Sequence, residues 1–314
     1  MIEKLLTRNN PLIDPHLEIW EWQVPLYLFL GGLCAGLLIL SALLVLLKRE
    51  QDFPFSTKWG ALLAPAFLSL GMACLFWDLS SKLHVFRFYT AFKPMSALSW
   101  GAWLLVLVYP ANLLFLVMLW KLPDFVPQKI TGWYDKLRAV VLTYKTPLAV
   151  INLALGLGVG IYTGVFLSSL VAIRLWNSAL MGPLFLISGL STAAALAVLF
   201  ERGHREKHQL GAADSGLILV ELALLLLLVI DLLAGCGGNR CAAQFLLTDG
   251  VAHIFWIGLV GLGLLVPLVL EVFNNFTGNV RAFWVAPLLV LSGGLILRFL
   301  MVITGQEVIC TLAF

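Results

Sequence analysis

Eight runs of residues in this sequence are apolar, almost free of charge and long enough to cross a bilayer. A hydrocarbon core about 30 Å thick requires roughly 20 such residues in a helix. Polar and apolar residues do not alternate along these runs, so helices rather than a barrel would satisfy the backbone. The sequence therefore predicts an all-α integral membrane protein with eight transmembrane helices. The expected spans are Val24–Leu47, Trp59–Trp77, Pro94–Trp120, Thr146–Ile173, Leu175–Phe200, Ser215–Gly235, Gly250–Leu270 and Ala282–Gly305.

Composition agrees with a membrane location. Of the 314 residues, 61% are hydrophobic and 12% are charged, whereas about 25% are charged in soluble domains. The net charge of +3 is spread over loops, so no nucleic-acid partner is expected. We expect one membrane domain over 1–314, with an extracytoplasmic segment 1–22 that is not a cleaved signal peptide, helices one to five in 23–201 and helices six to eight in 213–306.

Loop charges predict the orientation. Eight crossings place both termini on one side, where the loops carry seven Lys and Arg residues, against twelve on the other side. Because cytoplasmic loops carry the excess of Lys and Arg, both termini are expected outside, in the cytoplasmic (inner) membrane of the cell.

Cysteines and histidines predict no metal centre in this protein. Cys236 and Cys241 are close in sequence, and either a loop disulfide or two free thiols fits them. His204 and His208 indicate a basic cytoplasmic loop more than a metal site. Only His253 lies within a span, whereas a haem needs axial ligands and an iron–sulfur cluster needs about four cysteines. We therefore expect neither group here, and a redox function would need a partner that carries the metal centres.

Arg298 needs a partner, because it lies in the apolar stretch "GGLILRFLMVITGQ". A guanidinium facing acyl chains costs from about 2.5 to about 10 kcal/mol or more. Asp78 shares its expected depth near the outer face, so we expect an ion pair, either near a ligand site or as a structural lock. The other polar residues expected near that face are Glu21, Gln23, Tyr27, Tyr162, Thr163, Asp231, His253 and Gln306.

Buried acids in the inner half suggest a proton path. Glu221 lies in "VELALLLLLVID", and a path from Glu221 to Asp78 would cross most of the membrane. The alternative is a neutral acid bonded to a neighbouring helix. The candidates for this path are Glu221, Asp231, Glu271 and Arg298.

The outer polar cluster suits an amphipathic ring with two oxygens, such as a quinol. Its oxidation needs hydrogen-bond partners and an acid–base group with a route to water. Tyr27, Tyr162 and Asp78 fit these roles, although the tyrosines also fit ordinary interfacial aromatics. The aromatic walls are expected from Trp20, Trp22, Trp77 and Trp100, and the further cofactor-binding candidates are Gln23, Thr163 and His84. Lys82, His84 and Arg87 lie in the outer loop where a partner would dock.

Four segments resemble the NrfD family, which includes the polysulfide reductase membrane subunit, and they occur in that family's order. They are "WEWQVPLYLFLGGLCAG", "FKPMSALSWGAW", "GIYTGVFLS" and the terminal helix from Arg298 to Gln306. The resemblance implies two four-helix bundles that exchange electrons with menaquinone or ubiquinone. It also implies a four-cluster ferredoxin-like iron–sulfur subunit as partner, which serves a molybdopterin enzyme or a multihaem cytochrome c.

The same resemblance implies particular site residues. The family's quinone-site tyrosine and histidine fall on Tyr162 and Tyr27, so tyrosine replaces histidine here, and its side chain titrates near 10 rather than near 6.5. The family's acid and arginine fall on Asp78 and Arg298. We therefore expect a quinol-interacting subunit of a respiratory oxidoreductase, active only with its partners and with its quinone site near the periplasmic side. The alternative is a secondary transporter whose buried acids and Arg298 bind a substrate or ion.

Overall fold

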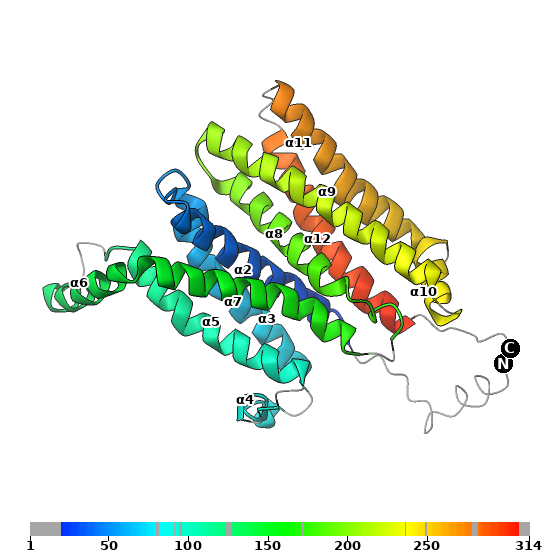
Figure 1. Ribbon diagram of the computed structural model, residues 1–314, viewed down its shortest axis with the longest axis horizontal. Coiled ribbons are helices and arrows are strands. Elements are labelled where there is room, and N and C mark those ends of the chain that lie inside the picture. Colours follow the sequence, from blue (N-terminus) through cyan, green and yellow to red (C-terminus); the bar gives the residue numbers. More distant parts are fainter. Residues whose placement is uncertain are drawn as a thin grey trace.

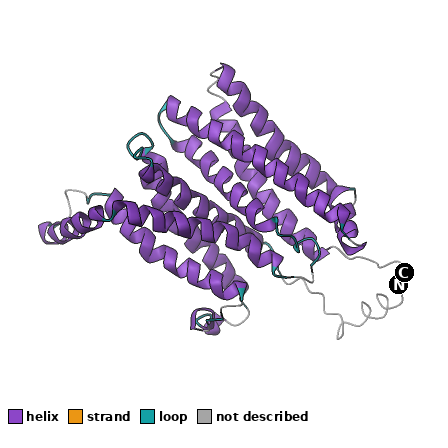
Figure 2. Ribbon diagram, viewed as in Figure 1, coloured by secondary structure: helices purple, strands orange, loops and turns teal. Residues whose placement is uncertain are grey.

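The computed structural model describes residues 20–79, 82–90, 92–93, 96–122, 127–170, 173–235, 237–248, 250–277 and 282–307. These residues form helices and no strands (Figure 2). Eight of the helices are long and apolar enough to cross a membrane. The predicted all-α class and the predicted number of spans are therefore confirmed.

The spanning helices form two groups of four (Figure 1). The first bundle comprises α2 (Gln23–Leu46), η1 (Phe55–Trp59) with α3 (Gly60–Asp78), α5 (Ala97–Leu119) and α7 (Lys145–Ser168). The second comprises α8 (Met181–Phe200), α9 (His204–Ala234), η3 (Ile254–Leu265) with α11 (Val266–Thr277), and α12 (Ala282–Glu307). The shorter elements are η2 (Lys82–His84), α4 (Arg87–Thr90), α6 (Gln128–Thr143) and α10 (Gly237–Leu247).

Helix α2 joins the two bundles. It packs against α3 and α7 of the first bundle and against α8 and α12 of the second, and most of its residues are buried. Glycines allow the close approach of α2 to α8: a Cβ on Gly189 of α8 would lie 2.6 Å from the carbonyl oxygen of Gly32. Lipid tails are as apolar as the helices, so such close van der Waals contact is a main source of helix association in a bilayer.

The two ends of the described part of the protein meet. The side-chain amide of Gln306 accepts a hydrogen bond from the Trp20 N–H and donates one to the Trp20 carbonyl, both at 2.9 Å. The first span therefore begins on the side where the last span ends, as an even number of crossings requires.

Three segments differ from the expected loops. Helix α6 occupies part of the connection between the third and fourth spans, and α10 part of the connection between the sixth and seventh. Helix α9 begins at His204, well before the expected start at Ser215. Charged residues interrupt the apolar pattern of α6 and of the first turns of α9, so hydropathy over a window long enough to span the membrane does not detect either as helix.

The contact between Gly32 and Gly189 generates a stability prediction. We expect Gly189→Ala to lower the free energy of unfolding by about 1–3 kcal/mol, because the added methyl overlaps backbone that cannot rotate away. Gly216→Ala on α9 is the matched control, since a Cβ there meets nothing within 4 Å and alanine favours the helix. Thermal unfolding of the two detergent-solubilised variants measures the difference, and equal melting temperatures would contradict the contact.

Candidate functional site

A cavity of about 700 Å³ lies at one end of the first bundle. The start of α2, the end of α3, the first half of α5 and the end of α7 surround it, and the segment around α4 adds to its rim. The lining is mostly apolar and aromatic, as in sites for small organic ligands. The lining residues are Trp20, Val24, Tyr27, Ser69, Met72, Ala73, Leu75, Phe76, Asp78, Leu79, Val85, Tyr89, Leu98, Ala102, Leu105, Tyr109, Tyr162 and Phe166.

Four tyrosines bring hydroxyl groups to this cavity, and two of them were predicted from the sequence. Tyr27 and Tyr162 are 5% and 8% exposed. Tyr109 was not predicted; its hydroxyl lies 3.0 Å from that of Ser69. Tyr89 was not predicted either, and burial and the neighbouring Tyr109 raise its pKa. Tyr89 therefore remains protonated, and able to donate a hydrogen bond, at neutral pH.

Gly101 determines where the Tyr162 ring lies. A Cβ built on Gly101 of α5 would overlap that ring, including its hydroxyl oxygen. The motif "SALSWGAW" is visible in the sequence, but the role of its glycine was not predicted, because a residue's neighbour on another helix cannot be read from one sequence. Tyr162 can pack against α5 because residue 101 has only a hydrogen atom in place of a side chain.

Stacked rings form the wall nearest the second bundle. Trp20 stacks on Trp176 with centroids 5.2 Å apart and contacts Phe166 at 5.6 Å. Trp176 is buried and donates from its indole nitrogen to the carbonyl of Met301 on α12, at 2.7 Å. The rings therefore connect the cavity to the end of α12.

Asp78 is the carboxylate of the cavity. It is the last residue of α3 and is partly exposed, so protons can pass between it and water.

The expected ion pair of Asp78 with Arg298 is not formed. Among the described side chains, ion pairs occur between Arg49 and Asp52 and between Lys145 and Glu50. Helix α3 packs on α2 and α5, whereas α12 packs on α2, α8, α11 and η3. Helix α2 lies between α3 and α12. Asp78 and Arg298 are therefore not neighbours, although the sequence predicted the same depth for both.

The other three residues predicted to bind a cofactor do not line the cavity. The Gln23 amide lies 3.4 Å from a Glu21 carboxylate oxygen. The Thr163 hydroxyl donates to the Gly160 carbonyl at 2.9 Å. His84 is exposed in η2, with its ring 6.4 Å from that of Phe86. Tyr27, Tyr162 and Asp78 are therefore the predicted residues that the structure brings together.

Arg298 lies inside the second bundle and is 1% exposed. Its guanidinium donates to the Ser188 hydroxyl, to the Gly294 carbonyl at 3.1 Å and to the Phe185 carbonyl at 3.0 Å. Its carbon centre also lies 5.0 Å from the centre of the Phe185 ring. Its acidic neighbour is Glu221, which interacts with both Ser188 and Arg298. Glu221 and Arg298 therefore share one level of the bundle, rather than lying in opposite halves as expected.

A second group of buried acids lies nearby. Asp214 accepts a hydrogen bond from Ser191 at 2.6 Å, and Glu271 accepts one from Ser215 at 2.7 Å. The Asp214 and Glu271 carboxyls lie close enough to interact electrostatically, and Asp214 also lies within electrostatic reach of Glu221. Asp214 was not predicted from the sequence, because it lies between the charged start of α9 and the apolar run. The fourth proton-path candidate, Asp231, is exposed and accepts from Ser178 at 2.8 Å.

The described residues include no group of three or more His, Cys, Asp or Glu side chains that could hold a metal ion. Cys34, Cys74 and Cys241 are free thiols. The suggested partner of Cys241, Cys236, lies outside the described residues.

The fold and the site define a class: a multi-pass membrane protein of two four-helix bundles, with an aromatic cavity at one end of the first and a buried acid–arginine cluster in the second. A family model described as "Polysulphide reductase, NrfD" matches residues 9–310. The protein belongs to the NrfD family, and the predicted membership is confirmed.

Individual relatives are similar over most of the sequence. The C chain of polysulfide reductase from Wolinella succinogenes is 30% identical over 303 residues, covering 92% of the present protein and 94% of that relative. Protein NrfD of Escherichia coli K12 is 29% identical over 304 residues, with 92% and 95% covered. The C subunit of selenate reductase from Mesobacillus selenatarsenatis is 26% identical over 323 residues, with 90% and 73% covered.

The position of Arg298 generates a test by double-mutant cycles. We expect the effects of Arg298→Met and Glu221→Gln on the free energy of unfolding to be non-additive. The double variant should differ from the sum of the two single effects by about 0.5–3 kcal/mol, because the two side chains interact. Arg298→Met and Asp78→Asn should add within about 0.5 kcal/mol, because α2 separates them. Unfolding in a denaturing detergent titration gives each value. Coupling to Asp78 but not to Glu221 would contradict the structure.

Proposed function

We propose that this protein is the quinone-interacting membrane subunit of a respiratory oxidoreductase complex. In this proposal it exchanges electrons between menaquinol or ubiquinol in the bilayer and an iron–sulfur subunit docked on the extracytoplasmic side. The observation that carries the proposal is the cavity of about 700 Å³, where buried tyrosine hydroxyls and one carboxylate meet apolar walls.

The cavity fits the chemistry of a quinol ring. Its walls from Trp20, Leu105 and Phe166 suit a flat apolar body, and the hydroxyls of Tyr27 and Tyr162 suit ring oxygens. When bound, a quinol supplies two electrons and two protons. Most of the lining residues belong to helices long and apolar enough to cross a membrane, so we infer that a lipid-soluble ligand enters the cavity from the bilayer.

We assign separate tasks to the polar residues. The Tyr27 and Tyr162 hydroxyls orient the ligand by hydrogen bonds, and buried hydrogen bonds of this kind also select against ligands without oxygens. Asp78 accepts a proton and passes it to water, because it lines the cavity and is partly exposed at the end of α3. A tyrosine at position 27 makes a carboxylate necessary for this step, since a phenol is a weak base near neutral pH.

Electrons would leave through a docked partner. The segment that carries the exposed side chains of Lys82, His84 and Arg87 also supplies Val85 and Tyr89 to the cavity. A subunit bound to this segment would therefore lie directly beside the ligand. In this reading His84 belongs to the docking surface rather than to the cavity.

The names of the relatives support a multi-subunit complex. Two of them are single components, each designated C, of a polysulfide reductase and a selenate reductase. We infer that the present protein likewise serves a catalytic subunit, a molybdopterin enzyme or a multihaem cytochrome c, which would define the terminal substrate.

A proton path through the second bundle is the second part of the proposal. Glu271, Asp214, Glu221 and Arg298 form a series of buried polar groups, with Ser188, Ser191 and Ser215 beside them. Buried ionisable residues in a membrane protein are functional by default, often as proton relays. Asp231 would lie at the exposed end of α9, beyond this series.

Ligand affinity tests the quinone site. We expect Tyr162→Phe to weaken binding of a fluorescent hydroxyquinoline N-oxide, a quinol analogue, by about 3- to 10-fold, the value of one hydrogen bond. Gly101→Ala should weaken it more, because it displaces the whole ring. Tyr144→Phe is the matched control, since Tyr144 is 60% exposed and precedes the first residue of the same helix. Fluorescence quenching by the purified complex measures the three affinities.

Unchanged affinity in both Tyr162→Phe and Gly101→Ala would contradict the site. Uptake of a solute into vesicles by the isolated protein would instead favour the transporter alternative.

Vesicle measurements test the proton path. We expect Glu221→Gln to abolish proton translocation while quinol oxidation continues, because the variant keeps the hydrogen bonds of the side chain but does not ionise. Asp231→Asn at the exposed end of α9 should leave translocation unchanged. Unaltered translocation in Glu221→Gln would reject the path and leave the quinone site intact.

A further inference from the structure

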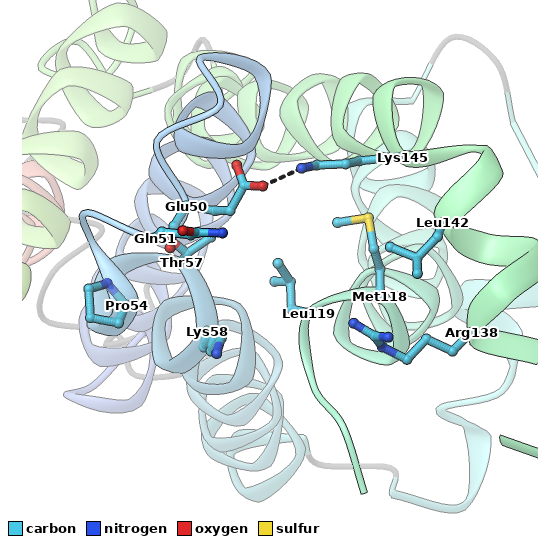
Figure 3. Close-up of a pocket in the computed structure, with 10 residues that line it drawn as sticks. All are labelled: Glu50, Gln51, Pro54, Thr57, Lys58, Met118, Leu119, Arg138, Leu142 and Lys145. Carbon is cyan, nitrogen blue, oxygen red and sulfur yellow. Dashed lines mark hydrogen bonds and ion pairs between the residues drawn. The ribbon is translucent and has the colours of Figure 1, made fainter. Parts of the chain in front are cut away.

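A second cavity of about 370 Å³ lies at the opposite end of the first bundle (Figure 3). It is bounded by the turn after α2, η1, the end of α5, the amphipathic helix α6 and the first residue of α7. The lining residues are Glu50, Gln51, Pro54, Thr57, Lys58, Met118, Leu119, Arg138, Leu142 and Lys145.

The cavity carries an excess of positive charge. The lining contains three cations, Lys58, Arg138 and Lys145, and a single carboxylate, that of Glu50, with which Lys145 is ion-paired. Figure 3 shows Lys58 and Arg138 on opposite sides of the cavity, away from this pair. Within the described residues neither has a carboxylate within 4.0 Å. The lining therefore has a net charge of two positive, borne by Lys58 and Arg138.

Two buried polar atoms in the lining have no hydrogen-bond partner among the described residues. They are the Nε of Arg138, a donor, and the Oε2 of Glu50, an acceptor. An unmade hydrogen bond on a buried charged group is costly. A ligand that satisfies both must carry an anionic acceptor and, a short distance away, a hydrogen-bond donor.

Aromatic residues place the cavity at the level of lipid headgroups. Trp59 and Trp120 pack edge to face at 5.2 Å, and the Trp120 indole donates to the carbonyl of Lys58 at 3.3 Å. Helix α6 exposes Trp133 and Val140 beside its charged residues. Tryptophan belts and amphipathic helices of this kind mark the boundary between headgroups and acyl chains.

We propose that this cavity binds the headgroup of an anionic phospholipid of the phosphatidylglycerol class. The phosphodiester lies between Lys58 and Arg138 and accepts a hydrogen bond from the Nε of Arg138. A hydroxyl of the glycerol headgroup donates a hydrogen bond to the Oε2 of Glu50. Met118, Leu119 and Leu142 contact the apolar part of the lipid, for which inorganic phosphate has no counterpart. A choline headgroup would place a positive charge in a positively charged site, and it has no hydrogen-bond donor for the Oε2 of Glu50.

The site does not depend on the quinone proposal. It lies at the other end of the bundle, so a lipid bound there would hold α6 and the end of α5 against the turn after α2. The expected orientation would place it on the cytoplasmic leaflet, where basic pockets between helices recognise anionic lipids.

Native mass spectrometry of the full-length protein with its bound subunits tests this proposal. Titration with dioleoylphosphatidylglycerol should show one retained lipid, whose dissociation constant rises about fivefold in Lys58→Gln and about fivefold in Arg138→Gln. Lys129→Gln is the matched control, because it removes an exposed cation from the same α6 helix outside the cavity. That variant should bind like the wild type. Arg138→Lys should lose less affinity than Arg138→Gln, which separates charge recognition from a folding defect.

Four results would overturn the proposal. They are equal retention of dioleoylphosphatidylcholine, equal retention of dioleoylphosphatidylethanolamine, displacement of the lipid by millimolar inorganic phosphate, and an equal loss of affinity in Lys129→Gln. The first two would show that the headgroup charge is not recognised, the third would assign the site to a soluble anion, and the fourth would reduce it to general surface electrostatics.

Discussion

The burial of one guanidinium group, that of Arg298, constrains the helices at the junction of the two bundles. A charge removed from water must recover its lost hydration from fixed partners. Ser188 and the Phe185 carbonyl on α8, the Gly294 carbonyl on α12 and Glu221 on α9 supply them. The same guanidinium rests on α2, where a Cβ at Gly32 would lie 3.0 Å from its terminal nitrogen. Four helices are therefore positioned by one side chain, and the junction tolerates only glycine-sized contacts on the α2 side.

Helix α2 separates two kinds of chemistry. On one side lies the aromatic cavity, with Tyr27 and Asp78; on the other lies the series of buried acids that ends at Arg298. In the proposed function, quinol oxidation with proton release through Asp78 would therefore occur in the first bundle, and proton translocation across the membrane in the second. The stacked pair of Trp20 and Trp176 joins the two, because Trp20 lines the cavity and Trp176 bonds to Met301 on α12. Coupling between the bundles would require movement of α2 or of this stacked contact.

The sequence predicts the eight spans well because hydropathy over a bilayer thickness is a local property of the polypeptide. It also predicts that Tyr27, Tyr162 and Asp78 belong together, since all three are expected near the same face of the membrane. The sequence does not predict which residues of different helices lie side by side at the same depth. Equal depth suggested that Asp78 pairs with Arg298, but the face of a helix that meets another depends on packing between distant segments. For the same reason the roles of Gly101 and Asp214 cannot be predicted without the three-dimensional structure. Helix α6 is not predicted either, because its charged residues mask a short amphipathic pattern.

Photolabelling of the assembled complex with an azido-quinone, followed by peptide mapping, would locate the bound quinone directly. We expect labelling of the cavity walls, on the peptide from Trp20 to Tyr27 and on the peptide from Met72 to Leu79, with protection by unlabelled quinol. Protected labelling confined to α9, α11 or α12, with none on these two peptides, would contradict a quinone site in the first bundle.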